Sequence, residues 1–454
     1  VPDVSPDVPD VSPDVPDVSP DVPDVSPDVP DVSPDVPDVS ALLALGITRA
    51  VPLRKRLIAR GGVAMQPEDL PLAGTVVLDF SQFLAGPVAA LRLADLGSRV
   101  IKVERPHTGE IGRTLAFAGR SAAGDTLSFH AMNRNKEAVV ADLKDPADLA
   151  RVKDLVARAD VIIENFRPGV MERIGLDYAS VRELNPGLVY ASASGYGDTG
   201  PWASRPGQDL LAQAVSGATW LAGADRPMTV GLSLADHLMS CHLAEGVTAL
   251  LVRRARTGRG GLVETSLLEG MLDLQATLLT RPEGEDLAGS PRPMSAWTPT
   301  GIFATKDGYV ALTGVPLDEL ATTLGDAELA QLAATGSWEK DPDRVSDLIA
   351  AALSRDTTAA WLDALHAQDG SSEWFAPVLT LEELLASPEF AALEMTQQVE
   401  RSAPEPGGAS VTLTTTRSPI RIDGEILRHR RGAPRLGEHG ILRDGADPLE
   451  GWPA

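Results

Sequence analysis

Two aspartates stand where a carboxylate could do chemistry. Asp236 follows an apolar stretch at 231–235 and opens a run with helical periodicity over 235–256. At a helix start such a carboxylate can be an N-cap or first-turn residue that suits the helix dipole. Inside an apolar site it can instead act as a nucleophile or a base. The spacing leaves both interpretations open. Asp209 has the same ambiguity, and its context favours helix capping.

Three arginines form a second group of candidates. Arg105, Arg113 and Arg173 each follow the end of an expected strand or lie in a turn. Taken singly, each is expected to be a solvated charge. As a set near one sheet edge they could hold phosphate groups, which guanidinium groups bind in a bidentate way.

Two further patterns carry less weight. Residues 195–200, GYGDTG, fit the G-x-G-x-x-G pattern, but Pro201 and Pro206 interrupt the helix that should receive a pyrophosphate, which favours a glycine-rich loop. His237, Cys241 and His242 lie one helical turn apart without a further set of ligands at metal-binding spacing. We therefore expect no metal site there, and expect the cysteine to be a buried packing residue.

The elements around these residues alternate between strand and helix. Residues 75–106 predict a strand (75–80), a helix (87–97) that begins at a proline and ends at a glycine, and a second strand (99–104). Such a βαβ unit places a turn and a helix N-terminus at the carboxyl edge of a parallel sheet, where open α/β folds bind nucleotide-like ligands.

The alternation continues and predicts a doubly wound, mostly parallel α/β sheet in a large domain, 72–275. A smaller α+β domain is expected over 290–400, and a C-terminal segment, 401–454, that returns to the large domain. The further elements expected are strands at 138–143, 161–163 and 188–193, a helix from Asp145 to about Ala159, a short helical region with Arg173, helices at 208–222 and 235–256, and a hairpin over 301–313.

Composition excludes several classes of function. The 454 residues are 43% hydrophobic, without an apolar run long enough to span a bilayer, so we expect no membrane partner. A single cysteine excludes an intrachain disulfide. The formal charge of -24 argues against nucleic acid as a partner. The basic residues near position 55 follow the apolar stretch instead of preceding it, unlike a signal peptide, and predict a cytoplasmic protein.

Residues 1–64 have a different character from the rest. The first 40 repeat the heptad VPDVSPD and hold eleven aspartates, with no Lys or Arg, which predicts a disordered acidic tail and linker. The repeat is either an acidic spacer or docking arm, or a duplicated DNA tract translated in frame. In the second case the folded protein begins near Met65.

From about residue 72 to the C-terminus, and most strongly over 72–270, the chain resembles the class III coenzyme A transferases. This family includes carnitine CoA-transferase, formyl-CoA transferase and α-methylacyl-CoA racemase. The resemblance rests on the order and spacing of many segments. They are LDFSQFLAGP, LADLGSRVIKVERP, NRNKEAVVADLK, ADVIIENFRPGVMERIGL, NPGLVYASASGYGDTGP, GQDLLAQAVSG, LSLAD and RTGRGG.

The resemblance implies a role for each candidate. Asp236 matches the transferase nucleophile, and Asp209 and Gln208 match supporting positions beside it. The turn at Gln82, Phe83, Leu84 and Ala85 matches the one that lines the thioester site, where backbone N–H groups could stabilise an oxyanion. The remaining implied CoA-binding residues are Arg105 and Arg173 at the nucleotide, Asn165 and Phe166 along the pantetheine and adenine, and Arg113.

The resemblance also implies a reaction and an assembly. Asp236 would exchange CoA between an acyl-CoA and a small carboxylic acid through aspartyl anhydride and aspartyl-CoA thioester intermediates. Coenzyme A is then a substrate, and neither a metal nor a redox cofactor is needed. The implied assembly is an interlocked homodimer, with active sites between the large domain of one subunit and the small domain of the other.

Several positions depart from particular members of the family. The racemase histidine before Asp209 is Gln208 here, which cannot shuttle a proton, and no racemase glutamate appears near 315–317. The glycine-rich loop of formyl-CoA transferases corresponds to SPRPMSAW at 290–297, and their tryptophan corresponds to Leu115. These departures argue against oxalate or formate as substrate, and Leu84 and Leu115 indicate a less polar acyl pocket. Three hypotheses remain: a CoA-transferase, a racemase or isomerase that uses Asp236 as a base, and a non-catalytic CoA-binding regulator.

Overall fold

The computed structural model describes residues 67–115, 119–222, 226–284, 299–367, 374–403 and 410–450. The expected acidic tail over 1–64 and the SPRPMSAW segment lie outside these residues. Their interpretations therefore stay predictions.

Six parallel strands form the central sheet, which confirms the predicted α/β class. Two strands lie on one side of the first strand, β1 (Val76–Asp79), and three lie on its other side, beginning with β6 (Val161–Glu164). The direction in which the chain winds therefore changes between β1 and β6. Ligands of open α/β sheets bind at the carboxyl edge at such a switch point. In spatial order the strands are β5 (Lys136–Val140), β2 (Arg99–Glu104), β1 (Val76–Asp79), β6 (Val161–Glu164), β7 (Val189–Ser194) and β8 (Gly261–Ser266).

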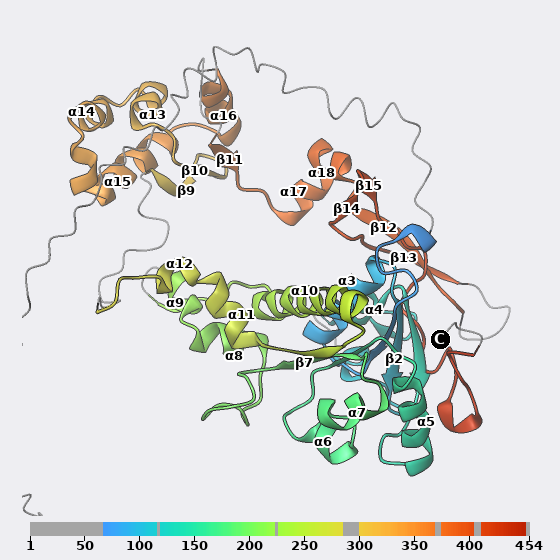
Figure 1. Ribbon diagram of the computed structural model, residues 1–454. Coiled ribbons are helices and arrows are strands. Elements are labelled where there is room, and N and C mark those ends of the chain that lie inside the picture. Colours follow the sequence, from blue (N-terminus) through green and yellow to red (C-terminus); the bar gives the residue numbers. More distant parts are fainter. Residues whose placement is uncertain are drawn as a thin grey trace, which may run out of the picture. The chain divides into compact units, whose positions relative to one another are not determined.

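Helices cover both faces of this sheet (Figure 1). Neighbouring strand residues point to opposite faces, so Val77 joins one hydrophobic core and Leu78 the other. One face packs against α3 (Ala85–Asp95), α8 (Asp209–Val215), α10 (Leu234–Thr257) and α11 (Leu267–Leu274). The other packs against α5 (Pro146–Val156), α6 (Val170–Ile174) and α7 (Tyr178–Leu184).

Some expected boundaries were wrong. The single helix expected over 208–222 is two helices, α8 and α9 (Ala218–Ala222), with Gly217 between them at a φ of 86° that interrupts a right-handed helix. The strand expected at 138–143 is β5, which begins two residues earlier and ends three residues earlier. It directly follows Asn135, whose φ of 60° makes the turn. The helix expected at 235–256 is present as α10 and is one residue longer at each end.

A third hydrophobic core lies over residues 303–365. The expected hairpin is present as β9 (Thr300–Ala304) and β10 (Tyr309–Thr313), and β11 (Phe375–Pro377) pairs with β10. Helices bury Leu320, Val345 and Ile349 in this core. The helices of residues 317–393 are α13 (Leu317–Leu324), α14 (Ala327–Thr335), α15 (Pro342–Leu353), α16 (Thr358–His366), α17 (Leu381–Ala386) and α18 (Pro388–Leu393).

The last described residues contact the sheet domain. His439 N donates to Ala138 O (2.9 Å), and Ile441 forms a bridge with Val140, so this segment covers the β5 edge. The smaller elements are β3 (Ser121–Ala122), β4 (Asp125–Thr126), α4 (Leu127–Asn133), α12 (Ala276–Leu279), β12 (Thr396–Arg401), β13 (Val411–Thr416), β14 (Arg421–Ile422) and β15 (Glu425–Ile426), with short 3-10 turns at Pro67–Asp69, Ile111–Arg113, Ser337–Lys340 and Leu442–Asp444.

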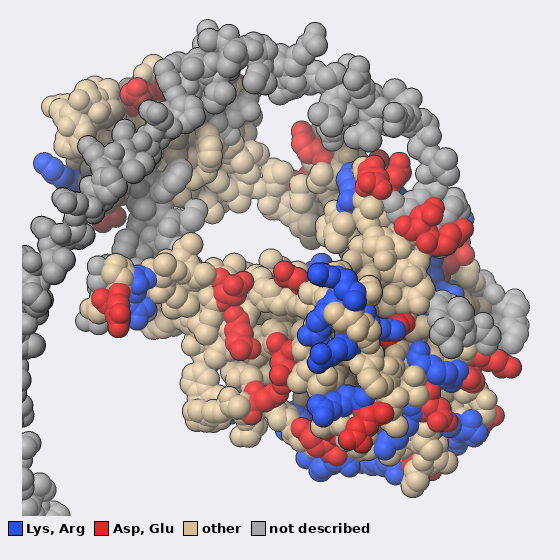
Figure 2. Space-filling view, in the orientation of Figure 1, with Lys and Arg blue, Asp and Glu red and all other residues tan. Residues whose placement is uncertain are grey.

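Charged groups of both signs share the surface. On the face drawn in Figure 2, a group of basic residues lies near the middle of the sheet domain, and basic and acidic residues are interspersed around it. Within the described ranges, no helix combines the length and the apolar character that crossing a membrane requires.

Candidate active site

The turn after β1 is bound to the loop after β6 at the switch point of the sheet. Gln82 N donates to Asn165 Oδ1, and Asn165 Nδ2 donates back to Gln82 O, both at 2.8 Å. Phe83 has a φ of 71°, which is strained for a residue with a side chain, and its N–H donates to Glu110 Oε2 (3.0 Å). These contacts hold a strained turn in one conformation.

Two of the four N–H groups expected to line an oxyanion site are therefore already bonded. The N–H groups of Leu84 and Ala85 differ, because they precede the first intrahelical hydrogen bond of α3, from Val88 N to Leu84 O (2.8 Å). The first amides of a helix have no intrahelical acceptor. A Cβ on Gly86 would lie 2.3 Å from Ser81 Cβ, so only glycine fits this close turn. Of the four N–H groups expected to stabilise an oxyanion, those of Leu84 and Ala85 therefore remain as candidates.

A buried ionic cluster lies behind the turn. Asp79 Oδ2 is 2.8 Å from Lys136 Nζ and 3.6 Å from Lys102 Nζ, and all three side chains are fully buried. Burial opposes ionisation of Asp79, but the two ammonium groups outweigh it and lower its pKa to about 2. Lys102 Nζ donates to Ser81 O and Lys136 Nζ to Pro87 O, both at 2.8 Å. The two lysines thus bind backbone carbonyl groups on both sides of the turn and stabilise its conformation.

Asp236 lies in the first turn of α10, and Asp209 caps that helix. The N-cap residue, Ser233, makes no side-chain capping bond. Instead Asp209 Oδ1 accepts from Asp236 N (3.1 Å), while its Oδ2 accepts from Gln213 Nε2 (2.6 Å). The capping expected of Asp209 is thus directed at a neighbouring helix, 27 residues further along the chain.

The Asp236 carboxylate has an unusual environment. Its residue is 6% exposed, and within the described ranges its side chain forms neither a hydrogen bond nor an ion pair. Burial, and next the charge of Asp209, raise its pKa to about 7. A poorly solvated carboxylate without a partner is a better nucleophile than a solvated one.

Asp236 lines a cavity of about 600 Å³. The cavity brings Asp236 together with the turn after β1 and the loop after β6. Of the residues expected at the reacting centre, all except Asp209 line this cavity. Asp209 contacts Asp236 through the backbone N–H of that residue. The lining residues include Gln82, Phe83, Leu84, Ala85, Asn165, Phe166, Gln208 and Asp236.

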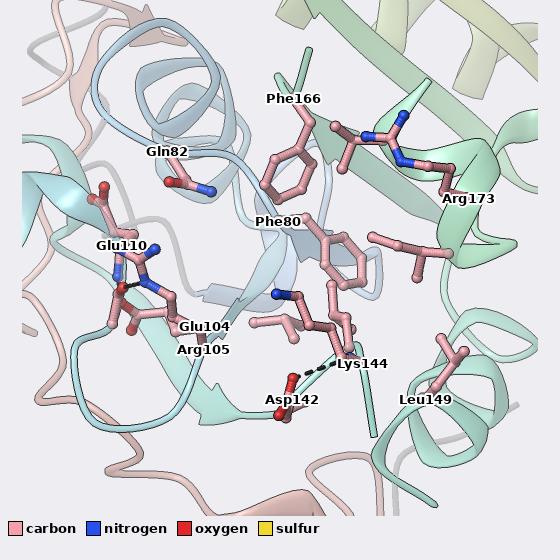
Figure 3. Close-up of a pocket in the computed structure, with 16 residues that line it drawn as sticks. Phe80, Gln82, Glu104, Arg105, Glu110, Asp142, Lys144, Leu149, Phe166 and Arg173 are labelled. Atoms are coloured by element: carbon pink, nitrogen blue, oxygen red, sulfur yellow. Dashed lines mark hydrogen bonds between the residues drawn. The ribbon is translucent and has the colours of Figure 1, made fainter. Parts of the chain in front are cut away.

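A second cavity of 570 Å³ adjoins the first, because Gln82 and Phe166 line both. Arg105 and Arg173 line it, as expected for nucleotide-binding residues (Figure 3). Figure 3 shows the rings of Phe80 and Phe166 near its middle, with Arg173 from α6 on one side and Arg105 on the other. Lys144 also lines this cavity, and the sequence-based set omitted it. It follows β5 by four residues, so the same rule of cations after strand ends would have found it.

Arg113 lies elsewhere, and its interpretation as a solvated charge was wrong. It is 6% exposed, donates to Glu104 Oε2 (2.6 Å) and Asp125 Oδ2 (2.9 Å), and stacks 4.0 Å from the ring centroid of Phe129. It lines neither cavity. Two buried carboxylates explain this position, because they compensate a guanidinium removed from water. Its proposed contact with CoA has no geometric support here.

The glycine pattern at 195–200 forms a loop, and its first glycine has a packing role. A Cβ on Gly195 would lie 2.5 Å from Gly207 Cα, so the two backbones cross in contact. This crossing places Gln208 beside the Asp236 cavity. Cys241 is exposed and not buried as expected. No set of three or more His, Cys, Asp or Glu residues among the described ones has an arrangement that could hold a metal ion.

Known proteins match most of the chain. The family model of CoA-transferase family III matches residues 72–440. A succinate–glutarate CoA-transferase of Agrobacterium fabrum is 32% identical over 81% of this chain and 94% of its own length. An acetyl-CoA:oxalate CoA-transferase of Acetobacter aceti is 34% identical over 82% and 94%. The solved structure of a CAIB/BAIF family protein from Brucella suis superposes with a TM-score of 0.68 at 31% identity, and covers 82% of this chain and 97% of its own.

Proposed function

The chain belongs to CoA-transferase family III, and from this premise we propose that Asp236 transfers coenzyme A from an acyl-CoA to a small free carboxylic acid. One observation carries the assignment of the nucleophile. The unpaired carboxylate of Asp236, with its pKa raised to about 7, faces a cavity that the Leu84–Ala85 turn also lines. In this cavity a substrate thioester can reach both the carboxylate and the oxyanion donors.

The proposed reaction has four balanced steps. An Asp236 oxygen attacks the thioester carbon, the C–S bond breaks, and CoA thiolate leaves an aspartyl acyl anhydride. The thiolate attacks the aspartyl carbonyl, which releases the donor acid as its carboxylate and forms an aspartyl-CoA thioester. The acceptor carboxylate then displaces the thiolate to form a second anhydride. Attack of the thiolate on the acceptor carbonyl yields the new acyl-CoA and frees Asp236, with no net proton or electron transfer.

The two cavities divide the substrate between them. Arg105, Lys144 and Arg173 bind the phosphates in the second cavity. The pantetheine arm passes between Gln82 and Phe166, which border both cavities, and reaches Asp236. The N–H groups of Leu84 and Ala85 stabilise the oxyanion of each tetrahedral intermediate.

The alternative is a racemase or isomerase of the same fold in which Asp236 acts as a base. A carboxylate with a pKa of about 7 suits proton abstraction as well as nucleophilic attack. The neighbouring side chain in the cavity is Gln208, however, and an amide cannot return a proton to the opposite face. Transfer of CoA is therefore the better supported function.

A homodimer is the proposed assembly. Large apolar side chains are exposed on helices α8 to α12, and monomeric proteins rarely expose so many in one region. Sedimentation of the purified chain should give twice the monomer mass. The exposed residues in question are Leu210, Leu211, Val215, Trp220, Leu221, Leu272, Leu274 and Leu279.

Covalent trapping tests the proposed function. The protein is incubated with succinyl-, acetyl- or propionyl-CoA, quenched with hydroxylamine, and digested. An aspartyl hydroxamate at Asp236 that is absent from Asp236→Asn supports the transferase. An unmodified Asp236 with every donor, together with deuterium uptake at the acyl α-carbon in heavy water, would favour the isomerase instead.

A further inference from the structure

The Asp236 cavity holds more positive charge than a simple acyl pocket needs. Of its lining residues, only Arg167, Arg205 and Asp236 are ionisable. The other lining side chains are apolar or neutral, among them Ile111 and Met239. With Asp236 ionised the wall therefore carries a net charge of +1, from two cations against one anion.

The phosphates of CoA do not account for these two arginines. The adjoining cavity has three cations of its own, Arg105, Lys144 and Arg173, beside three carboxylates, and neither Arg167 nor Arg205 lines it. The two arginines share a cavity with the reacting carboxylate instead. Within the described residues neither forms a salt bridge with an Asp or Glu.

Arg205 is also held in place. Its guanidinium carbon lies 5.3 Å from the ring centroid of Trp202, and its backbone N–H donates to Trp202 O (2.9 Å). The ring of Trp202 in turn meets that of Tyr196 edge to face, with 5.8 Å between centroids. A guanidinium stacked on an aromatic ring keeps its N–H donors free for a planar anion. Arg167 is the weaker candidate, because it also borders a hollow that contains Glu164 and Glu172.

We infer that the acceptor is a dicarboxylic acid, and that Arg205, assisted by Arg167, binds the carboxylate that does not react. This inference rests on the proposed CoA transfer and adds its substrate class. One carboxylate of the acid attacks the aspartyl-CoA thioester, as in the third step above, while the other stays ionised on the guanidinium. A monocarboxylic acid of similar length leaves the guanidinium without its anion. Arg205 is thus a specificity-determining residue.

The test compares acids that differ only in the second charge. With acetyl-CoA as donor, kcat/KM is measured for succinate and glutarate, and for butyrate and monomethyl succinate. A charge-assisted pair corresponds to about 10- to 100-fold in affinity, so the wild type should favour the diacids by about that factor. Arg205→Met should remove most of this preference, because kcat/KM falls much more for the diacids than for butyrate, and Arg205→Lys should restore part of it. Arg167→Gln should reduce the preference less.

Arg182→Met is the matched control, because Arg182 is an exposed arginine of α7 that lines neither cavity. It should leave the preference for diacids unchanged. Equal kcat/KM values for monomethyl succinate and succinate in the wild type, or an equal loss of kcat/KM for both in Arg205→Met, would overturn this inference. Neither result would contradict the proposed transfer of CoA. If every acid fails and Asp236 also forms no hydroxamate with any donor, the proposed function is wrong and the inference falls with it.

Discussion

The carboxylate of Asp209 accepts a hydrogen bond from the backbone N–H of Asp236, with 3.1 Å between Oδ1 and N. The N-terminus of α10 would by itself stabilise a negative charge on Asp236. Asp209 accepts a hydrogen bond from one of the N–H groups at this helix N-terminus and places a like charge near Asp236. Both the burial of Asp236 and this charge raise its pKa. Asp236 is therefore held with a pKa far above that of a solvated aspartate.

The rate of CoA transfer should rise with pH through about 7. Below this value Asp236 is protonated and cannot attack a thioester, and above it the carboxylate forms. The measurement is kcat/KM for the acyl-CoA as a function of pH, with thioester stability checked without enzyme. A rate already at its plateau near the ordinary aspartate pKa of 3.8 would contradict the raised pKa.

Asp209→Asn should move this pH profile to lower values by about half a unit to one unit. The amide oxygen can still accept from Asp236 N, but the like charge is gone. Burial, the larger cause of the shift, remains, so the profile should not return to that of a solvated aspartate. Asp209→Ala serves as comparison, because it also removes the hydrogen bond. An unchanged profile in Asp209→Asn would show that its charge does not act on Asp236.

Asp236→Asn should stabilise the fold, and more so as pH rises. The folded-state pKa of Asp236 lies above the unfolded value, so its stabilising contribution is complete below about 3.8 and is lost as pH rises through about 7. Asparagine never ionises and avoids that loss, which amounts to at most about 4 kcal/mol. Melting temperatures of both proteins should therefore diverge between acidic and mildly basic buffers. A constant difference would contradict the sign of the shift.

Arg173→Ala should raise KM for acyl-CoA by about 10-fold and leave kcat almost unchanged, since the lost contact is to a part of the substrate that does not react. The informative comparison is an acyl-pantetheine, which lacks the nucleotide and should be used equally well by both proteins. Arg173 is better suited to this test than Arg105, whose Nε also donates to Gly109 O (2.7 Å) and shapes its own loop. A loss that is the same with acyl-pantetheine would place Arg173 outside the phosphate site.

Lys136→Met should destabilise the sheet domain by about 3–5 kcal/mol, because it removes the nearer of the two ammonium groups that compensate the buried charge of Asp79 and leaves the more distant Lys102. Denaturant unfolding measures the change. Arg344→Met is the control, since it breaks a pair with Glu328 (2.7 Å) in which both side chains are about half exposed. Such exposed pairs contribute little, and no measurable change is expected. Similar effects of both substitutions would contradict the role of burial.

Local patterns predicted much of the architecture. The strand, turn and helix over 75–106 and the long helix near 235–256 follow from apolar periodicity and from the positions of proline and glycine, which act over a few residues. The loop at 195–200 could be told from a nucleotide-binding helix because Pro201 follows it directly and Pro206 comes five residues later. Periodicity did not show the break at Gly217, since a single glycine is compatible with either a helix or its end.

Partners distant in the chain could not be predicted in this way. The sequence placed Arg105 and Arg113 in one group of candidates, yet Arg113 is buried between carboxylates and Arg105 lines a cavity. Gln82 and Asn165 bind each other across 83 residues, which removes one N–H group from the expected oxyanion site. Such contacts depend on which strands become neighbours, and no local pattern contains that information.

The sequence by itself determined the elements, the class of sheet and, through many ordered segments, the resemblance to a family whose nucleophile matches Asp236. The tertiary structure alone decided what surrounds that carboxylate. It brought Asp209 to the start of α10 and placed Arg205 in the same cavity as Asp236. It also supplied the side-chain acceptors that bind the N–H groups of Gln82 and Phe83. The physical reason is that hydrophobic periodicity and turn chemistry act over a few residues, whereas burial and charge coupling depend on groups that only the folded chain brings together.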